Sequence, residues 1–461
     1  MSFRRETDFL GEVPVPSDAL YGSFTARALN NFKVSGLVIH PDFIRNIAVV
    51  KKAAAEANHE LGILDEERFS AMSVALNEVI EGKHGEMFPL DVFQAGAGTP
   101  WNMNVNEVVA NRANQVLGKP LGSYSPVHPN DHVNLSQSSN DVIPSTIRIT
   151  SLLLLRDFQS ALASIEYSLG EKAGSFSAHR KSARTHTRDA VPITLGQEFS
   201  AYVQMVRNHS SKIEASSKFL EFISLGGTAV GTGLNAPVGF STKVSAKLRH
   251  VTGLDLRTAP NLFEKTQFAS DFLHLMNAIS ALCVDLVKMN NDLMLMSSGP
   301  TTGLSEINLP SVEPGSSIMP GKVNPSILEM VSMVAYQVQG NRSTVENAAQ
   351  AGMFDLNVYT PLIAFNLFNS ITWLTKAVIA LDERCIRDIT ANPDVLERYF
   401  LESNAIATLL SPIIGYEKAS QLARKAAETG TPITRLAVED GHVSESKLDE
   451  LLKKSVGAPI K

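Results

Sequence analysis

Long apolar repeats constrain the fold of this chain more than any other feature of its sequence. Apolar residues recur in steps of three and four over residues 268–296, and no Gly or Pro interrupts residues 261–298. Such steps are typical of the buried face of an α-helix. As one helix, residues 261–298 would be roughly 57 Å long. A helix of that length needs other long helices beside it, and the repeat favours near-parallel bundle packing.

The same periodicity occurs over residues 43–61, with Gly62 as a stop signal, and again over 155–169 and 367–381. Strand patterns are sparse, and we expect residues 133–136 and 224–240 to form loops or short pairings. The sequence therefore predicts an all-α fold built on a bundle of long helices. Changes in pattern near residue 140 and at Asn392-Pro393 predict three domains: an N-terminal domain (1–140), a central long-helix domain (141–392) and a small C-terminal helical domain (393–461).

The composition predicts a globular protein, because charged residues make up 19% and hydrophobic residues 44% of 461. A net charge of −6 without a basic tract argues against nucleic acid as a partner. The only cysteines, Cys283 and Cys385, predict no disulfide framework and a reducing, cytoplasmic compartment, with Cys283 in the core. The N-terminus lacks an apolar signal region, so no secretory signal is expected. The sequence contains no run of about 20 apolar residues, so no membrane span is expected.

Residues 315–325, hereafter the signature loop, read Gly-Ser-Ser-Ile-Met-Pro-Gly-Lys-Val-Asn-Pro. Pro314, Pro320 and Pro325 place this segment outside a helix interior. A Ser- and Gly-rich loop with one lysine, flanked by rigid helices, suits a mobile lid that closes on an anion. The alternative is an ordinary Gly/Pro connector.

Three other polar clusters interrupt the helical pattern, at residues 98–104, 136–141 and 184–186. With the signature loop they supply hydroxyls, amides, a histidine and a lysine, which suits binding of a small, oxygen-rich anion. Spacing does not show that the clusters converge. Each one alone also fits capping or turn chemistry: Asn140 or Asp141, for example, would cap a helix starting near Pro144.

The signature loop resembles that of the fumarase/aspartase superfamily, and the resemblance covers almost the whole chain. It includes residues 6–12, 128–134, 195–198, 226–235, Glu306 and 414–419. The resemblance implies a homotetramer with a twenty-helix core, five long helices from each subunit, and active sites shared between subunits. It implies small dicarboxylate substrates and no cofactor.

The reaction implied by the resemblance is a reversible anti elimination that gives fumarate while an amine or hydroxide leaves. Residues 21–25, 50–54 and 298–310 resemble aspartase more than fumarase, so we expect aspartate or an N-substituted aspartate as the substrate. By the matching positions, Ser316 is the general base and Glu329 orients His186. The remaining roles follow in the same way: Thr99, Ser138, Ser139 and Ser317 hold the enolised carboxylate, Lys322 and Asn324 hold the other carboxylate, and Asn140, Thr185 and His186 surround the leaving group.

Two other functions remain open. Fumarate hydratase belongs to the same superfamily, and the signature loop is equally typical of it. A structural protein on this fold, like the related lens crystallins, is the third hypothesis. The intact Ser316, His186, Lys322 and Asn324 argue against a structural role.

His128 and His132 have the i,i+4 spacing of a helical zinc site. Pro129 and Asn130 between them predict a turn instead, and the chain lacks the glutamate that follows the first histidine in HExxH, so no metal is expected. The resemblance implies that His128, Asn130 and Asp131 belong to a second, non-catalytic dicarboxylate site.

Three residues depart from the superfamily pattern: Trp101, Arg188 and Thr301. They are either neutral changes or a change of specificity. Trp101 adds bulk and a flat face, and Arg188 adds a forked donor suited to a carboxylate. That pair would fit an N-substituted aspartate, with an amino acid as the leaving group.

Overall fold

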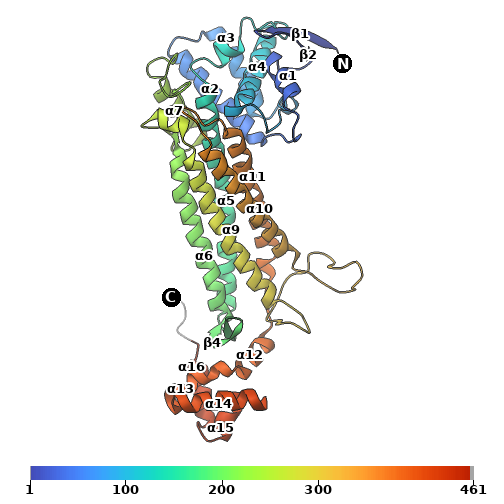
Figure 1. The fold of residues 1–461 in the computed structure, drawn as a ribbon, viewed down its shortest axis with the longest axis vertical. Coiled ribbons are helices and arrows are strands. Elements are labelled where there is room, and N and C mark those ends of the chain that lie inside the picture. The colour runs from blue at the N-terminus through green and yellow to red at the C-terminus, as the bar shows by residue number, and fades with distance from the viewer. Residues whose placement is uncertain (1, 457–461) are drawn as a thin grey trace. The chain divides into compact units, whose positions relative to one another are not determined.

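The computed structural model describes residues 2–456, and its architecture is helical, as predicted (Figure 1). The helices are α1 Ser23–Asn31, α2 Pro41–Glu60, α3 Glu66–Ile80, α4 Thr99–Val116, α5 Ser139–Ser175, α6 Leu195–Ser217, α7 Phe240–Thr252, α8 Leu262–Gln267, α9 Ser270–Met296, α10 Ser326–Gln350, α11 Thr360–Arg384, α12 Pro393–Glu402, α13 Ala407–Ile414, α14 Tyr416–Thr429, α15 Ile433–Glu439 and α16 Glu445–Lys454. The strands are β1 Phe3–Asp8, β2 Gly11–Pro16, β3 Arg180–Thr185, β4 Arg188–Thr194, β5 Phe222–Ile223, β6 Arg257–Thr258, β7 Ile307–Asn308 and β8 Thr390–Ala391, paired in sequence order.

The chain divides into two compact units. Unit 1 comprises Met1–Phe158, Ser211–Ala281 and Tyr336–Trp373, and unit 2 comprises Gln159–Ser210, Leu282–Ala335 and Leu374–Lys461. The long helices α5, α6, α9, α10 and α11 each contribute residues to both units. The division into domains at residues 140 and 392 stays a prediction.

Polar contacts identify long helices that are neighbours within each unit. In unit 2, the Tyr202 hydroxyl of α6 donates to Asp292 of α9 at 2.9 Å. In unit 1, the Asn341 amide of α10 donates to the Ser370 hydroxyl of α11 at 3.0 Å. The predicted apolar stripe of α11 faces inward, because five residues spaced by three and four are fully buried: Leu367, Ile371, Leu374, Val378 and Leu381.

The prediction of one continuous helix over residues 261–298 is wrong. Helix α8 ends at Gln267, Phe268 is extended, and α9 begins at Ser270. Asp271, in the first turn of α9, accepts hydrogen bonds from Lys265 and Arg148, both at 2.8 Å, and so ties the two helices together. Since neither Gly nor Pro marks this break, the apolar repeat alone did not reveal it. The 27-residue α9 is about 40 Å long.

Helix α5 begins at Ser139, five residues before the expected start near Pro144. The Ser138 hydroxyl accepts the Asn140 N–H at 3.2 Å, and the Asp141 carboxylate accepts the Ser138 N–H at 2.9 Å. This reciprocal pattern is that of a capping box, in which Ser138 is the cap instead of Asn140 or Asp141, and Asp141 is its partner. Pro144 lies inside the helix, where its ring nitrogen donates no hydrogen bond to the carbonyl of residue 140.

Two helical segments, Ser270–Met296 and Thr360–Asp388, are long and apolar enough to cross a membrane by length and composition alone. The expectation of no membrane span, which rested on uninterrupted apolar runs, stays a prediction. In the most apolar window of each segment, 44% and 56% of the residues are buried within the structure. Core helices of soluble proteins pass the same test, so these two segments are weak evidence for a membrane.

The hairpins β1–β2 and β3–β4 were not anticipated from the sequence. The β3–β4 hairpin places His186 and Thr187 in a two-residue turn with φ angles of 54° and 59°. Positive φ at both central residues is the geometry of a type I′ turn. Of the ranges 133–136 and 224–240, predicted as loops or short pairings, residues 134–136 and 224–239 are loops and turns, whereas Val133 ends the π-type turn and Phe240 begins α7.

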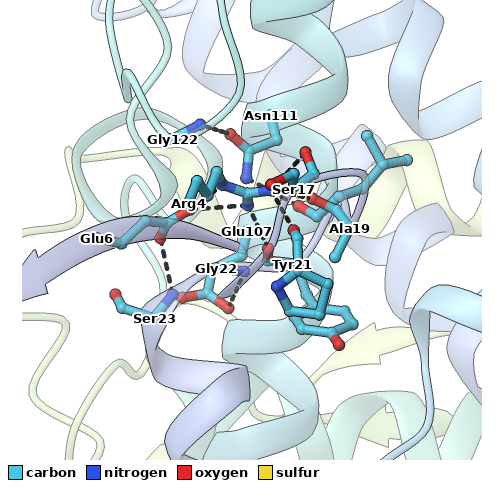
Figure 2. Close-up of polar contacts among 12 residues, drawn as sticks. Arg4, Glu6, Ser17, Ala19, Tyr21, Gly22, Ser23, Glu107, Asn111 and Gly122 are labelled. Atoms are coloured by element: carbon cyan, nitrogen blue, oxygen red, sulfur yellow. Dashed lines mark hydrogen bonds and ion pairs between the residues drawn. The ribbon is translucent and has the colours of Figure 1, made fainter. Parts of the chain in front are cut away.

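Two buried carboxylates hold the N-terminal hairpin and α1 against α4 (Figure 2). Glu107 of α4 accepts hydrogen bonds at 2.8–3.1 Å from three backbone N–H groups, those of Gly22, Phe24 and Thr25. Glu6 of β1 accepts the N–H of Ser23 at 2.8 Å. These carboxylates accept the first N–H groups of α1, which have no partners within the helix, as a capping side chain usually does. Their negative charge is also favourable at the positive end of the helix dipole. Burial raises the pKa of Glu107, against the effect of its hydrogen bonds.

Both cysteines lie in the core, as predicted for Cys283. Burial raises the pKa of each thiol to about 12.

Replacing Glu107 with Ala should lower the free energy of unfolding by about 2–4 kcal/mol, because three buried N–H groups lose their acceptor. Chemical denaturation measures this loss. Glu67, exposed in the first turn of α3, provides the control: Glu67→Ala should change stability by no more than about 0.5 kcal/mol. Similar losses in the two variants would contradict the capping role of Glu107.

Candidate functional site

In unit 1, two of the predicted polar clusters meet where two helices begin. Thr99 is the first residue of α4, Ser139 is the first residue of α5, and their hydroxyl oxygens lie 3.0 Å apart. The first N–H groups of a helix have no partners within the helix, and they form the positive end of its dipole. Two such ends side by side, each with a hydroxyl, suit an anion such as a carboxylate.

The Gly-rich segment 226–229 is fastened to the start of α5. The Asn140 amide donates to the carbonyl of Ala229 at 2.8 Å. Asp141 accepts the N–H groups of Gly226 and Thr228, both at 2.9 Å, in addition to that of Ser138. The Asp141 carboxylate therefore accepts three backbone N–H groups, which links residues 138–140 to the Gly-rich segment.

A buried lysine that the sequence analysis did not single out lies near this segment. The Lys51 ammonium of α2 donates to the side-chain oxygens of Asn134 and Gln137, both at 3.3 Å. Burial lowers the pKa of Lys51 to about 7, and burial raises the pKa of Asp141 to about 6. One signal was available: Lys51 lies four residues from both Ile47 and Ala55, on the buried face of α2.

The predicted second anion site shares a cavity with Thr99. His128 and Asn130 line a cavity of about 620 Å³ in unit 1 together with Thr99, whereas the exposed Asp131 is not among the lining residues. The His128 ring nitrogen Nδ1 accepts the N–H of Asn130 at 3.2 Å and that of Asp131 at 3.3 Å. Residues 129–133 form a single π-type turn, which agrees with the turn predicted from Pro129. Within residues 2–456, no three or more His, Cys, Asp or Glu side chains are grouped to hold a metal ion.

In unit 2, the signature loop folds back on itself. The N–H of Gly315 donates to the carbonyl of Lys322 at 2.8 Å, and the Asn324 amide donates to the carbonyl of Gly315 at 2.6 Å. A side chain at position 315 would bring its Cβ within 2.7 Å of the Lys322 carbonyl oxygen, so this crossing requires glycine.

The closed loop surrounds the hydroxyl of Ser316 with donors. Ser316 Oγ accepts the N–H of Ile318 at 3.2 Å and that of Met319 at 3.0 Å. Ser316 and Lys322 line the same hollow of about 480 Å³, while Ser317 is exposed beside it. Backbone donors and a lysine in one hollow favour negative charge, on the serine oxygen or on a ligand.

Thr185, His186 and Arg188 lie exposed at the turn of the β3–β4 hairpin, hereafter the hairpin turn (residues 185–188). Residues held at positive φ without glycine cost about 1–3 kcal/mol each and are frequent at functional sites. Glu329 is exposed in the first turn of α10. Within the described part of this chain, neither the His186 ring nor the Glu329 carboxylate makes a hydrogen bond.

Trp101 is buried, not presented to a ligand. Only 1% of its surface is exposed, and its ring packs edge-on against Phe43 with centroids 5.4 Å apart. It is also absent from the lining of the cavity that contains Thr99. This burial argues against direct contact with a substrate, so the specificity hypothesis rests on Arg188.

Comparisons with known proteins agree with the helical fold. A lyase family model matches residues 11–340, and a fumarase C C-terminus model matches residues 406–455. An aspartate ammonia-lyase from a Bacillus species is 44% identical over 97% of this chain and 96% of its own. A class II fumarate hydratase from Brucella suis is 43% identical over 98% and 97%. The crystal structure of a fumarate lyase:delta crystallin from Brucella melitensis bound to cobalt superposes with a TM-score of 0.95 at 42% identity, covering 98% of each chain.

The buried Lys51 should make stability rise with pH above neutrality. Below pH about 7 the folded and unfolded chains both hold its proton, and the cost of burying the charge is present in full. Between about 7 and 10.5 the folded chain has released that proton while the unfolded chain keeps it. The free energy of unfolding should therefore increase in this window, by at most about 1.4 kcal/mol per pH unit.

Urea denaturation from neutral to alkaline pH tests this expectation. Lys51→Met should lack the increase, whereas Lys52→Met should retain it, because Lys52 makes only an exposed contact with Asn77. Parallel pH profiles for wild type and Lys51→Met would show that Lys51 keeps an ordinary pKa.

Proposed function

Because the chain belongs to the fumarase/aspartase superfamily, a family of lyases, we propose that it eliminates an amine from aspartate or an N-substituted aspartate and releases fumarate. Cleavage of a carbon–nitrogen bond is the specific part of this proposal. It is supported by the aspartate ammonia-lyase among the relatives and by the exposed Arg188 two residues after His186.

The surroundings of the Ser316 hydroxyl carry the proposal. An ordinary serine is too weak an acid to act as a base by ionising, so its alkoxide needs strong stabilisation. The two N–H donors from Ile318 and Met319, with Lys322 lining the same hollow, supply stabilisation of that kind. Ser316 would take a proton from the carbon next to one carboxylate. The electrons left behind then form the double bond, while the electron pair of the breaking C–N bond leaves with the nitrogen.

The intermediate of this reaction holds extra negative charge on one carboxylate, and preorganised donors around it should lower the barrier most. Thr99, Ser138 and Ser139 at two helix starts are suited to that carboxylate, together with Ser317. Lys322 and Asn324 would bind the other carboxylate. Asn140, Thr185 and His186 would surround the leaving amine.

These residues belong to separate elements, so we propose a homotetramer in which subunits share active sites. His186 and Glu329 make no hydrogen bond within the described chain, and their pairing would then form between subunits. We also propose a cytoplasmic location and no cofactor.

Fumarate hydratase is the second candidate, because a class II fumarate hydratase is almost as similar to this chain as the aspartate ammonia-lyase is. The same base and carboxylate sites would serve, with water as the leaving group. A non-catalytic role is less well supported, since the loop of Ser316 retains its closed, donor-lined form.

Incubation of the enzyme with fumarate and a choice of nucleophile discriminates between these functions. Fumarate absorbance should fall when ammonia or an amino acid is present, and mass spectrometry should identify the aspartate or N-substituted aspartate. Malate as the sole product would establish the hydratase instead. Unchanged fumarate under every condition would support a non-catalytic protein.

Arg188→Gln extends this test to specificity. If Arg188 binds the extra carboxylate of an N-substituted aspartate, the variant should lose roughly 10- to 150-fold in kcat/KM for that substrate. Plain aspartate should lose little. The control is Arg424→Gln, an exposed arginine of α14, which should leave both substrates unaffected. Equal losses on both substrates for Arg188→Gln would assign it a positioning role.

Ser316→Ala should abolish turnover, by at least about a thousandfold in kcat, because the proposed general base is removed. Its fold and its binding of fumarate should remain close to wild type. Ser311→Ala is the matched control, since Ser311 lines the same hollow and is assigned no role. A Ser316→Ala enzyme that retains a tenth of the wild-type kcat would exclude serine as the base.

A further inference from the structure

A buried charge cluster lies under the hairpin turn and has no assigned role. The Lys181 ammonium donates to Glu198 at 2.6 Å and to Glu306 at 2.7 Å, and the Arg184 guanidinium donates to the other oxygen of Glu306 at 2.8 Å. The Glu306 side chain is 0% exposed and that of Lys181 is 1% exposed. All four charged residues belong to unit 2.

The cluster joins two segments that carry predicted active-site residues. Lys181 and Arg184 lie in β3, and Arg184 is two residues before His186. Glu306 is ten residues before Ser316, at the end of the turn that follows α9. The backbone of Glu306 is itself fixed, because its N–H donates to Met296 at 2.8 Å and its carbonyl accepts the N–H of Asn392 at 2.9 Å. Glu306 is therefore a fixed point to which the hairpin is attached.

A gain in folding stability does not by itself explain a cluster of this kind. Buried charges lose their hydration, and a protein with packed apolar side chains in their place is often as stable or more stable. Charged pairs instead fix the relative orientation of the segments they join, since each oxygen of the Glu306 carboxylate accepts a particular donor. Glu306 binds Lys181 through Oε2 and Arg184 through Oε1. Two contacts from one strand restrain both the position of β3 along its own axis and its rotation about that axis.

We propose that Glu306 is a positioning residue that acts through Arg184 and Lys181 to hold the hairpin turn in register with the segment leading to the signature loop. Glu306 does not touch the substrate. Its role is to keep Thr185, His186 and Arg188 where a leaving group can meet them, and this inference rests on the function proposed above. Small displacements of groups that contact a substrate lower the rate of the chemical step much more than they weaken binding.

Arg184→Gln tests the proposal with little risk to folding, because the side chain of Arg184 is 23% exposed and Lys181 stays paired with Glu306. We expect kcat to fall roughly 10- to 100-fold while KM changes by less than about threefold. Arg184→Lys should recover part of the loss. Arg180→Gln is the matched control: it removes another ion pair of β3, with Glu397, from a side chain that is 29% exposed. Its kcat should stay within about threefold of wild type.

Glu306→Gln should lower kcat to a similar extent, and the double variant with Arg184→Gln should lose no more than the worse single variant, because both remove the same link. Additive losses would overturn the proposal, and so would equal effects of Arg184→Gln and Arg180→Gln.

Hydrogen exchange of the amides in the hairpin turn gives a second readout that needs no substrate. Exchange should be faster in Arg184→Gln than in wild type and Arg180→Gln. If the wild-type enzyme has no lyase activity, the proposed function fails, and this measurement still decides whether Glu306 holds the turn. Unchanged exchange in Arg184→Gln, whether Glu306→Gln folds or not, would overturn the positioning role.

Discussion

The arrangement of unit 1 around its polar clusters depends on one buried carboxylate, Asp141. It accepts the N–H of Ser138 and so completes the cap of α5, and it also accepts the N–H groups of Gly226 and Thr228. A single side chain thereby ties the start of the longest helix to a segment more than 80 residues later. Three hydrogen bonds to one carboxylate offset much of the cost of its burial. Since Ser139 beside it contacts Thr99, the geometry of the proposed carboxylate site depends on this anchor.

In unit 2, buried ion pairs take the role that a carboxylate bound by backbone N–H groups has in unit 1. The unit 2 residues proposed for catalysis lie on a hairpin turn, on a closed loop and in the first turn of α10, which follows that loop directly. In the proposal above, the buried ion pairs of Glu306 with Lys181 and Arg184 hold the hairpin turn in position. In both units, then, charges in the interior determine where uncharged or exposed groups at the site are held. Such anchors are harder to repack than apolar contacts, because removing one partner leaves the other buried without its counter-charge.

The sequence predicted the fold well where local rules decide the outcome. The apolar steps of α2 and α11, and the Gly/Pro pattern of the signature loop, correspond to the helices and the loop observed. Prediction failed where distant contacts decide. Next to the break at Phe268, Asp271 contacts Arg148, which lies 123 residues earlier in the chain, and the β3–β4 hairpin has a turn without glycine. Likewise, no spacing rule shows that Thr99 and Ser139 meet, or that Trp101 turns into the core.

The two buried cysteines have a practical consequence. Their thiols are shielded and have a pKa of about 12, so almost no thiolate is present at neutral pH to react with a maleimide or an iodoacetamide. We therefore expect that the folded chain does not react with thiol-directed labels. A single cysteine introduced on the exposed surface would carry a fluorophore or spin label without prior removal of Cys283 and Cys385. Such labels would test whether the chain assembles into the proposed homotetramer in solution.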